Sequence, residues 1–146
     1  MLLNVPKILS PELLTALDQM GHTDEIVLSD GNFPALTLSQ GSAWGDPIYI
    51  KGVGVPELLD AVLTMIPLDY LAKESVIGML APADQGPQPI HQEFPKILEK
   101  HGYGADRLGM LPKPEFYRRA KNACCIVVTG EGARFANIIE RKGVVR

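Results

Sequence analysis

The chain has 146 residues, of which 46% are hydrophobic and 21% are charged, and its formal net charge at pH 7 is −3. This composition is typical of a globular protein, and it argues against a disordered chain or a basic nucleic-acid-binding protein. No apolar run reaches the about 18 to 20 residues that span a membrane. The N-terminal ten residues lack the apolar core of a signal peptide. We therefore expect one cytoplasmic domain over residues 1–146.

The N-terminal half of the chain shows two helix patterns and one short strand. Residues 10–21 predict a helix, because a serine cap and a proline precede leucines at helical spacing. Gly21 suits a left-handed stop of that helix. Residues 25–28 predict a short strand, and residues 29–34 have turn chemistry without a helix signal. A second helix is expected from Pro56 to about Ile66.

The C-terminal half continues the alternation of helices and strands. In chain order we expect a strand, a proline-rich loop, two helices, a buried strand and a final strand, at residues 75–80, 81–89, 93–101, 114–120, 123–129 and 138–139. The run at 123–129 is rich in valine and isoleucine, which suits a strand covered on both faces. This alternation predicts an α/β layered single domain, with a central sheet flanked by helices.

Three groups of residues in the second half have simple structural interpretations. Cys124 and Cys125 are adjacent on a predicted strand, so we expect two buried thiols and no disulfide between them. No Cys/His cluster has zinc spacing, so no metal site is predicted. The cluster of Arg118, Arg119 and Lys121 predicts a solvated helix face.

Polar residues beside predicted buried elements are the candidates for chemistry. His22 follows the first helix, and an imidazole can give and take protons near neutral pH. The alternative is that His22 binds the last carbonyls of that helix. Asp30 ends a strand, where it forms an Asx turn, binds ligand hydroxyls or orients the histidine. Asp69 leaves the same choice open.

A glycine-containing segment over residues 128–137 connects two predicted strands and can present backbone amides and the Asn137 side chain to a ligand. Its two glycines are too few and wrongly spaced for a phosphate-binding loop. The residues alone therefore indicate an α/β domain with a His/Asp site and leave the reaction open.

The motifs together resemble the D-ribose pyranase/L-fucose mutarotase family. The matching stretches follow the family's order over nearly the whole chain: Leu-Ser-Pro-Glu-Leu-Leu (9–14), Met-Gly-His-Thr-Asp-Glu-Ile-Val-Leu-Ser-Asp (20–30), Asn-Phe-Pro-Ala (32–35), Pro-Leu-Asp-Tyr (67–70), Glu-Phe-Tyr-Arg-Arg-Ala (115–120), Val-Val-Thr-Gly-Glu (127–131) and Ala-Asn-Ile-Ile-Glu-Arg-Lys-Gly-Val (136–144). Two of these stretches, Asn-Phe-Pro-Ala and Glu-Phe-Tyr-Arg-Arg-Ala, look like the fucose branch and favour it over the ribose branch.

The resemblance implies a ring-forming homo-oligomer, commonly a decamer, whose sugar site is completed by a neighbouring subunit. It implies that His22 is the catalytic histidine, and that Asp30, Asp69, Tyr117 and Asn137 bind the sugar or assist proton transfer. Two positions depart from the fucose branch. Phe135 replaces the usual tyrosine and so lacks its hydroxyl, and Lys113 replaces the usual arginine and so lacks a planar fork for bidentate hydrogen bonds.

The reaction that the resemblance implies is the interconversion of the anomers of a free monosaccharide by ring opening, without metal or organic cofactor. His22 would donate and accept the proton, while Asp69 or Tyr117 would serve the opposite transfer. Pyranose–furanose interconversion of D-ribose is the nearest alternative. A non-catalytic sugar-binding or transport-accessory protein is a second alternative, and a cofactor-dependent isomerase or aldolase a third.

Overall fold

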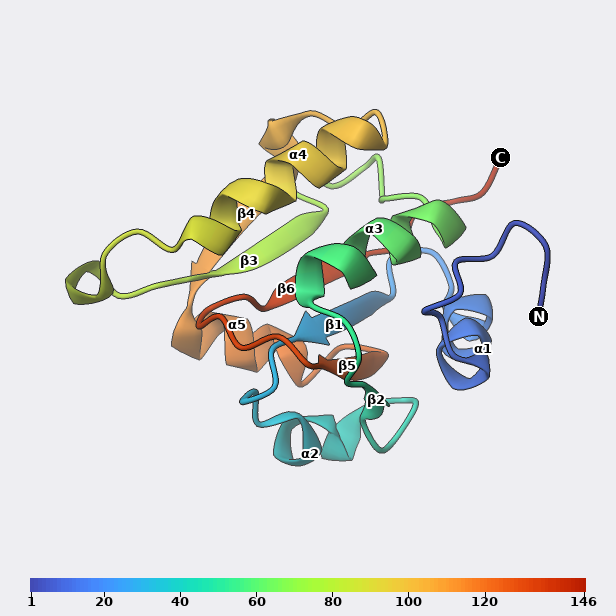
Figure 1. Cartoon of the computed structure of the whole chain (residues 1–146), viewed down its shortest axis with the longest axis horizontal. Helices are drawn as coiled ribbons and strands as arrows, with labels where there is room; N and C mark the ends of the chain where they lie inside the picture. The colour runs from blue at the N-terminus through green and yellow to red at the C-terminus, as the bar shows by residue number, and fades with distance from the viewer.

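The computed structural model describes residues 1–146 and contains one six-stranded sheet with helices on both faces (Figure 1). The strands are β1 Glu25–Ser29, β2 Ile48–Ile50, β3 Val76–Leu80, β4 Leu108–Pro112, β5 Cys125–Thr129 and β6 Ile138–Arg141. The α-helices are α1 Pro11–Gln19, α2 Ala35–Leu38, α3 Val55–Met65, α4 Glu93–Lys100 and α5 Lys113–Ala120. The expected α/β domain with a central flanked sheet is confirmed. None of its helices is long and apolar enough to cross a membrane.

The sheet has the strand order β2-β5-β1-β6-β3-β4. Strands β2, β5 and β1 run parallel, as do β3 and β4, while β6 is antiparallel to both of its neighbours, β1 and β3. Five strands therefore end at one edge of the sheet, and β6 begins there. We name this the carboxyl edge, marked by Asp30, Gly130 and Asn137. The opposite amino edge is marked by Asp24 and Lys142.

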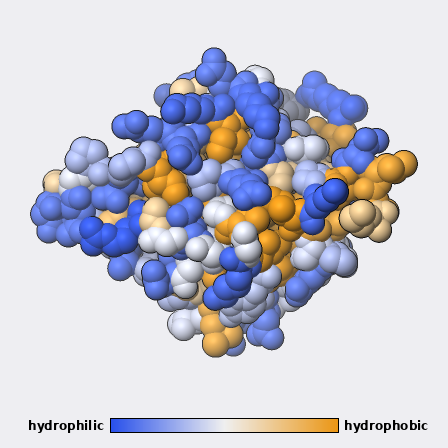
Figure 2. All heavy atoms as spheres, viewed as in Figure 1, coloured by the Kyte–Doolittle hydropathy of each residue, from blue (hydrophilic) through white to orange (hydrophobic).

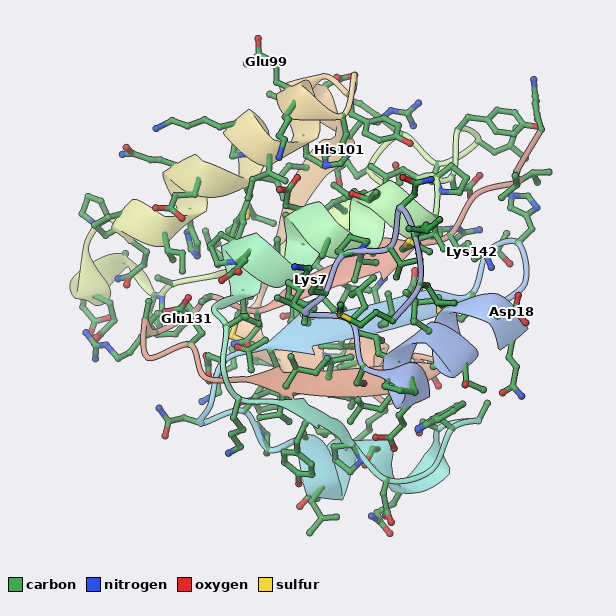
Figure 3. All side chains as sticks on the ribbon, turned by 45° about the vertical axis from the view of Figure 1, so that its right-hand side comes forward. Lys7, Asp18, Glu99, His101, Glu131 and Lys142 are labelled. Atoms are coloured by element: carbon green, nitrogen blue, oxygen red, sulfur yellow. The ribbon has the colours of Figure 1, made fainter.

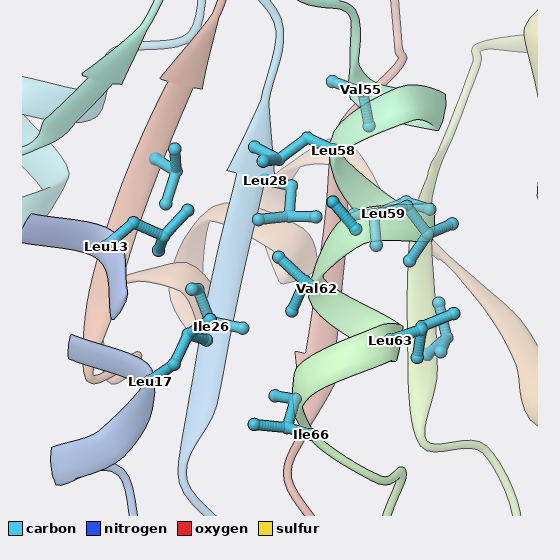
Figure 4. Close-up of a cluster of buried hydrophobic side chains, with 14 of the residues drawn as sticks. Leu13, Leu17, Ile26, Leu28, Val55, Leu58, Leu59, Val62, Leu63 and Ile66 are labelled. Carbon is cyan, nitrogen blue, oxygen red and sulfur yellow. The ribbon is translucent and has the colours of Figure 1, made fainter. Parts of the chain in front are cut away.

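The core consists of two layers, one on each face of the sheet. Helices α1, α3 and α4 pack on one face and α2 and α5 on the other. Figure 4 shows Leu17 of α1 beside Ile26 of β1, and Leu28 of β1 beside Leu58 of α3. Burying one such leucine side chain contributes about 1.5–3 kcal/mol relative to its exposure. This rigid frame holds the loops at both edges of the sheet.

At the ends of α1, the predicted serine cap is present and the predicted glycine stop is absent. The Ser10 hydroxyl accepts a hydrogen bond from the Leu13 amide at 3.1 Å, so the predicted cap is confirmed. The left-handed stop at Gly21 is wrong. Met20 ends the helix in an extended conformation, and the positive φ of 74° belongs to Thr23. Thr23 is β-branched, and a β-branched residue with a positive φ is strained. Gly102, two residues after the end of α4, has a positive φ of 82°, as suits a glycine.

Three elements were not predicted: strands β2 and β4 and helix α2. Three further expectations need correction. Arg119 is not part of a solvated face, because its guanidinium donates to both carboxylate oxygens of Glu25. The predicted strand at 123–129 begins only at Cys125. Both cysteines are free, but only Cys125 is buried, so the expectation of two buried thiols is wrong for the half-buried Cys124.

Candidate active site

A polar pocket of about 170 Å³ opens at the carboxyl edge of the sheet. It is lined by Asp30, Asn32, Phe33, Met79, Lys113, Tyr117, Arg134, Phe135 and Asn137. Met79 lies on β3, and the other residues follow β1 and β4 or precede β6, so the strand order brings together side chains that lie far apart in the sequence. Crevices at the carboxyl ends of parallel strands are where open α/β sheets bind ligands.

Asp30 and Asn137 form the polar base of this pocket. The Asp30 amide donates to the Asn137 side-chain oxygen at 2.8 Å, and the Asn137 side-chain nitrogen donates back to the Asp30 carboxylate at 3.0 Å. The Asn32 amide donates to the other Asp30 oxygen, which confirms the Asx turn. Burial raises the pKa of Asp30, although these hydrogen bonds oppose the rise. Both side chains are thus fixed before any ligand binds.

Aromatic side chains form the walls of the pocket. The Tyr117 ring packs edge-to-face on Phe33 with centroids 5.4 Å apart, and the Lys113 ammonium lies 5.3 Å from the centre of the Tyr117 ring. Phe135 has a positive φ of 58°, a strained conformation that its neighbours must maintain. One such neighbour is His91, whose Nε2 lies 2.8 Å from the Phe135 carbonyl oxygen. The pocket therefore presents apolar rings beside charged and amide groups.

His22 and Asp69 form a second polar centre, at the amino edge. The His22 Nε2 lies 3.0 Å from Oδ1 of Asp69, and the His22 side chain is 34% exposed while that of Asp69 is fully buried. Because a carboxylate only accepts hydrogen bonds, Nε2 carries the proton and Nδ1 is left as the acceptor. The alternative that His22 binds the last carbonyls of α1 is wrong. Lys142 donates to those carbonyls instead.

The buried Asp69 is fully paired. Arg141 Nε donates to its Oδ2 at 2.8 Å, and the Leu71 amide donates to its Oδ1. Arg107 donates to its backbone carbonyl. Burial alone would raise the pKa of Asp69, but the hydrogen bonds from His22, Leu71 and Arg141 outweigh it and lower that pKa. Asp69 therefore stays an anion at neutral pH and fixes the orientation of the His22 ring.

The predicted site residues thus fall into two groups at opposite edges of the sheet. The pocket group contains Asp30, Lys113, Tyr117, Phe135 and Asn137. The other group contains His22 and Asp69. Strand β1 separates the two groups by about 17 Å at the usual rise of a strand. Figure 3 shows the same separation, with Glu131 near the carboxyl edge and Lys142 near the amino edge. Asp30 therefore does not orient the imidazole of its own chain.

Sequence reasoning missed several residues of both groups. Arg141 and Arg107, which bind Asp69, gave no signal beyond a charge beside an apolar segment. Arg134 and Met79 of the pocket were missed as well, although Arg134 stands inside the glycine-containing segment. Nowhere do three or more His, Cys, Asp or Glu side chains gather in a way that could hold a metal ion.

Comparison with known proteins identifies the family of this chain. The model of the RbsD / FucU transport protein family matches residues 3–145. The chain belongs to this family. It is 46% identical over 147 residues to a human protein named fucose mutarotase, an alignment that covers 97% of this chain and 92% of the relative.

Solved structures of the RbsD / FucU family share the fold described above. The fucose mutarotase of Streptococcus pneumoniae, solved in complex with L-fucose, has a TM-score of 0.92 at 39% identity, covering 99% of this chain and 100% of that chain. Bacillus subtilis RbsD, solved with D-ribose, has a TM-score of 0.72 at 24% identity and covers both chains completely. At that identity the second likeness shows the fold alone.

Proposed function

We propose that this chain is an L-fucose mutarotase, an isomerase that interconverts the α and β anomers of the free sugar. The observation that carries the proposal is the His22–Asp69 pair, in which a buried carboxylate holds Nε2 of a partly exposed imidazole. The Nδ1 of that ring is left free to exchange a proton. The choice of L-fucose rests on the human and Streptococcus pneumoniae relatives named fucose mutarotase.

Mutarotation opens the hemiacetal and closes it on the other face of the carbonyl. One group protonates the ring oxygen while another removes the proton of the anomeric hydroxyl, and the roles reverse on closure. His22 Nδ1 carries one of these transfers in both directions, and positioned acid–base catalysis of this kind contributes about 10²- to 10⁴-fold. Asp69 acts through His22, by holding the ring in one tautomer and one orientation.

The pocket at the carboxyl edge binds the sugar. Asp30 and Asn137 are held by mutual hydrogen bonds and offer further acceptor and donor capacity to sugar hydroxyls. Lys113 adds a cationic donor. The Tyr117 hydroxyl serves the second proton transfer, since Tyr117 is the pocket residue whose hydroxyl can both donate and accept.

A single chain cannot place His22 on a sugar bound in its own pocket, because the length of β1 lies between them. The complete site therefore combines the pocket of one subunit with His22 of the next. Contacts of this head-to-tail kind generate a closed ring when the rotation between neighbouring subunits closes. The assembly is a homo-oligomeric ring, a decamer in the form that the family resemblance implies, and its location is the cytoplasm.

Exposed apolar side chains in the segments that follow Asp69 and Lys142 support this assembly. Leu71, two residues after Asp69, is 68% exposed, and Val145, near the C-terminus, is 72% exposed. Tyr70 and Val144 add to the same group. Figure 2 shows apolar atoms gathered on the side of the molecule where both termini lie. A patch of this kind is typical of a surface that another protein covers.

Saturation-transfer NMR of L-fucose tests the reaction. One anomeric proton signal is saturated, and the loss of intensity at the other anomer is followed with and without protein. Enzyme-dependent transfer with L-fucose, and weaker transfer with D-ribose, is the expected result. Transfer with D-ribose alone would assign D-ribose as the substrate. This sugar is included because Lys113 and Phe135 depart from the residues usual in the fucose branch. Binding of either sugar without any transfer would identify a non-catalytic sugar-binding protein instead.

A further inference from the structure

We infer that Lys142 is a positioning residue for His22. It holds the turn that carries the imidazole, residues 21–24, against the end of β6. The same strand end anchors Asp69. The inference rests on the proposed function, since it concerns how the proton-transferring group is held. Lys142 touches neither the pocket nor the imidazole, and it acts through the backbone on both sides of His22.

The ammonium of Lys142 caps the helix that precedes His22. Its Nζ lies 2.8 Å from the carbonyl oxygen of Leu17 and 2.5 Å from that of Met20. The last carbonyls of a helix have no partner within the helix, and a cation at this end also complements the helix dipole. Helix α1 has no basic residue in its own last turn. A lysine that lies more than 120 positions later in the sequence supplies that charge.

The backbone of Lys142 holds the residues that follow His22. The Thr23 amide donates to the Lys142 carbonyl at 2.9 Å, and the Lys142 amide donates to the Asp24 carbonyl at 2.9 Å. Thr23 has the positive φ of 74°, a conformation that a β-branched residue keeps only when its surroundings enforce it. His22 thus lies between a capped helix end and a strained residue, and both are fixed by the same lysine.

The other side of the same segment holds Asp69. Lys142 pairs with Leu68 in an isolated antiparallel bridge, and the Gly143 amide donates to the Pro67 carbonyl. A Cβ at Gly143 would collide with the Leu68 backbone, so glycine is required for this close approach. His22 and Asp69 lie 47 positions apart, yet Lys142 sets the position of both backbones. Figure 3 shows Lys142 on the same side of the molecule as Asp18 of α1.

The test compares Lys142→Met with Lys142→Arg and with a matched control, Lys100→Met. Methionine keeps most of the side-chain volume but removes the donors, while arginine restores donors and charge. Lys100 donates a hydrogen bond of 2.6 Å to Asp60 between α4 and α3, away from the site. We expect kcat of Lys142→Met to fall roughly 10- to 100-fold, the scale of a misplaced catalytic group, with KM changed less than about 3-fold. Lys142→Arg should recover most of this loss, and Lys100→Met should match the unaltered protein.

A second readout does not depend on activity. The ring nitrogen signals of His22 in ¹⁵N NMR should report one fixed tautomer in the unaltered protein and an average of two in Lys142→Met. If Lys142→Met does not fold, Lys142→Gln, which keeps one donor group, takes its place in both measurements. An unaltered protein without mutarotase activity would contradict the proposed function, and the ring signals would still decide the role of Lys142. Unchanged ring signals, or a lower Tm with full kcat, would overturn the inference.

Discussion

The two edges of the sheet each hold a buried carboxylate, and the partners of these two groups differ. At the carboxyl edge, Asp30 is surrounded by neutral amide donors, and burial raises its pKa. At the amino edge, Asp69 is paired with an imidazole and a guanidinium, and its pKa is lowered despite burial. Hydrogen bonds to the carboxylate decide the direction of the pKa shift of Asp69, and loss of water decides that of Asp30.

This difference assigns separate roles to the two edges. Groups whose environments move their pKa values in opposite directions typically mark an acid–base site. In the proposed mechanism, Asp69 stays ionised and orients the proton-transferring His22, while Asp30 keeps oxygen atoms available to sugar hydroxyls in a partly desolvated pocket. The proposed mechanism thus places the chemistry and the binding on different loops of one rigid sheet.

Replacing His22 with alanine should separate the two edges most strongly. We expect kcat for L-fucose anomer exchange to fall about 10²- to 10⁴-fold, because the proton carrier is lost. Sugar binding should change little, since the pocket residues of each chain are untouched. Saturation-transfer NMR measures the first quantity and calorimetric titration the second.

His101 provides the control for that experiment. It forms a comparable pair with Asp60, at 2.6 Å, between α4 and α3. His101→Ala removes an equivalent His–Asp contact away from both edges and should leave anomer exchange unchanged. Full activity in His22→Ala, or an equal loss in His101→Ala, would remove His22 from its role.

A third buried carboxylate, Glu140, lies between the two edges and makes the stability of the protein depend on pH. It lies on β6, which connects Asn137 with Arg141, and both of its carboxylate oxygens are buried without a partner. Burial raises the pKa of Glu140 to about 8. Between the ordinary pKa of 4.5 and that value, the folded protein keeps a proton that the unfolded chain releases. The free energy of unfolding should therefore fall as pH rises through this window, by up to about 1.4 kcal/mol per pH unit, and then level off.

Glu140→Gln removes that dependence. At pH 5 the variant and the unaltered protein should unfold at similar denaturant concentrations, while at pH 8 the variant should be more stable by a few kcal/mol. Figure 3 shows Glu99 projecting from α4 into solvent, so Glu99→Gln is the matched control and should follow the unaltered protein. A pH profile of unfolding that is the same in Glu140→Gln and in the unaltered protein would contradict the assignment.

The smallest expected effects concern substrate preference at the carboxyl edge. Phe135→Tyr adds a hydroxyl to the pocket, and a new hydrogen bond to the sugar is worth about 0.5–1.5 kcal/mol. We therefore expect KM for L-fucose to fall about 2- to 10-fold with little change in kcat. Lys113→Arg should act in the same direction through bidentate hydrogen bonds. Kinetics with L-fucose and D-ribose would check both variants, and a rise in KM for L-fucose would contradict this account of the pocket.

The parts of the fold that the sequence predicted carry strong local signals. Helix α1 has a serine cap and a proline, and β5 is a continuous apolar run buried along its whole length. The missed strands β2 and β4 are the two outermost strands of the sheet. Strand β2 has only three residues and β4 contains a glycine and ends on a proline, so neither shows a strand pattern. The four-residue α2 has no side-chain cap.

The sequence predicted individual residues of the candidate site but not the contacts between them. Spacing could not show that His22 meets Asp69, 47 positions later, or that Asp30 bonds Asn137, 107 positions later. Those contacts follow from the strand order, in which β6 inserts between β1 and β3. The family motifs marked the residues, but their division between two edges needed the three-dimensional structure.

Subunit mixing tests the division of the site most directly. His22→Ala and Asp30→Ala are prepared separately with different affinity tags, dissociated together, reassembled and purified through both tags. Each variant alone should be inactive. Random reassembly should restore about a quarter of the anomer-exchange activity, because that share of sites combines an intact pocket with an intact His22 from the neighbouring subunit. A mixture no more active than its two components would contradict a site shared between subunits.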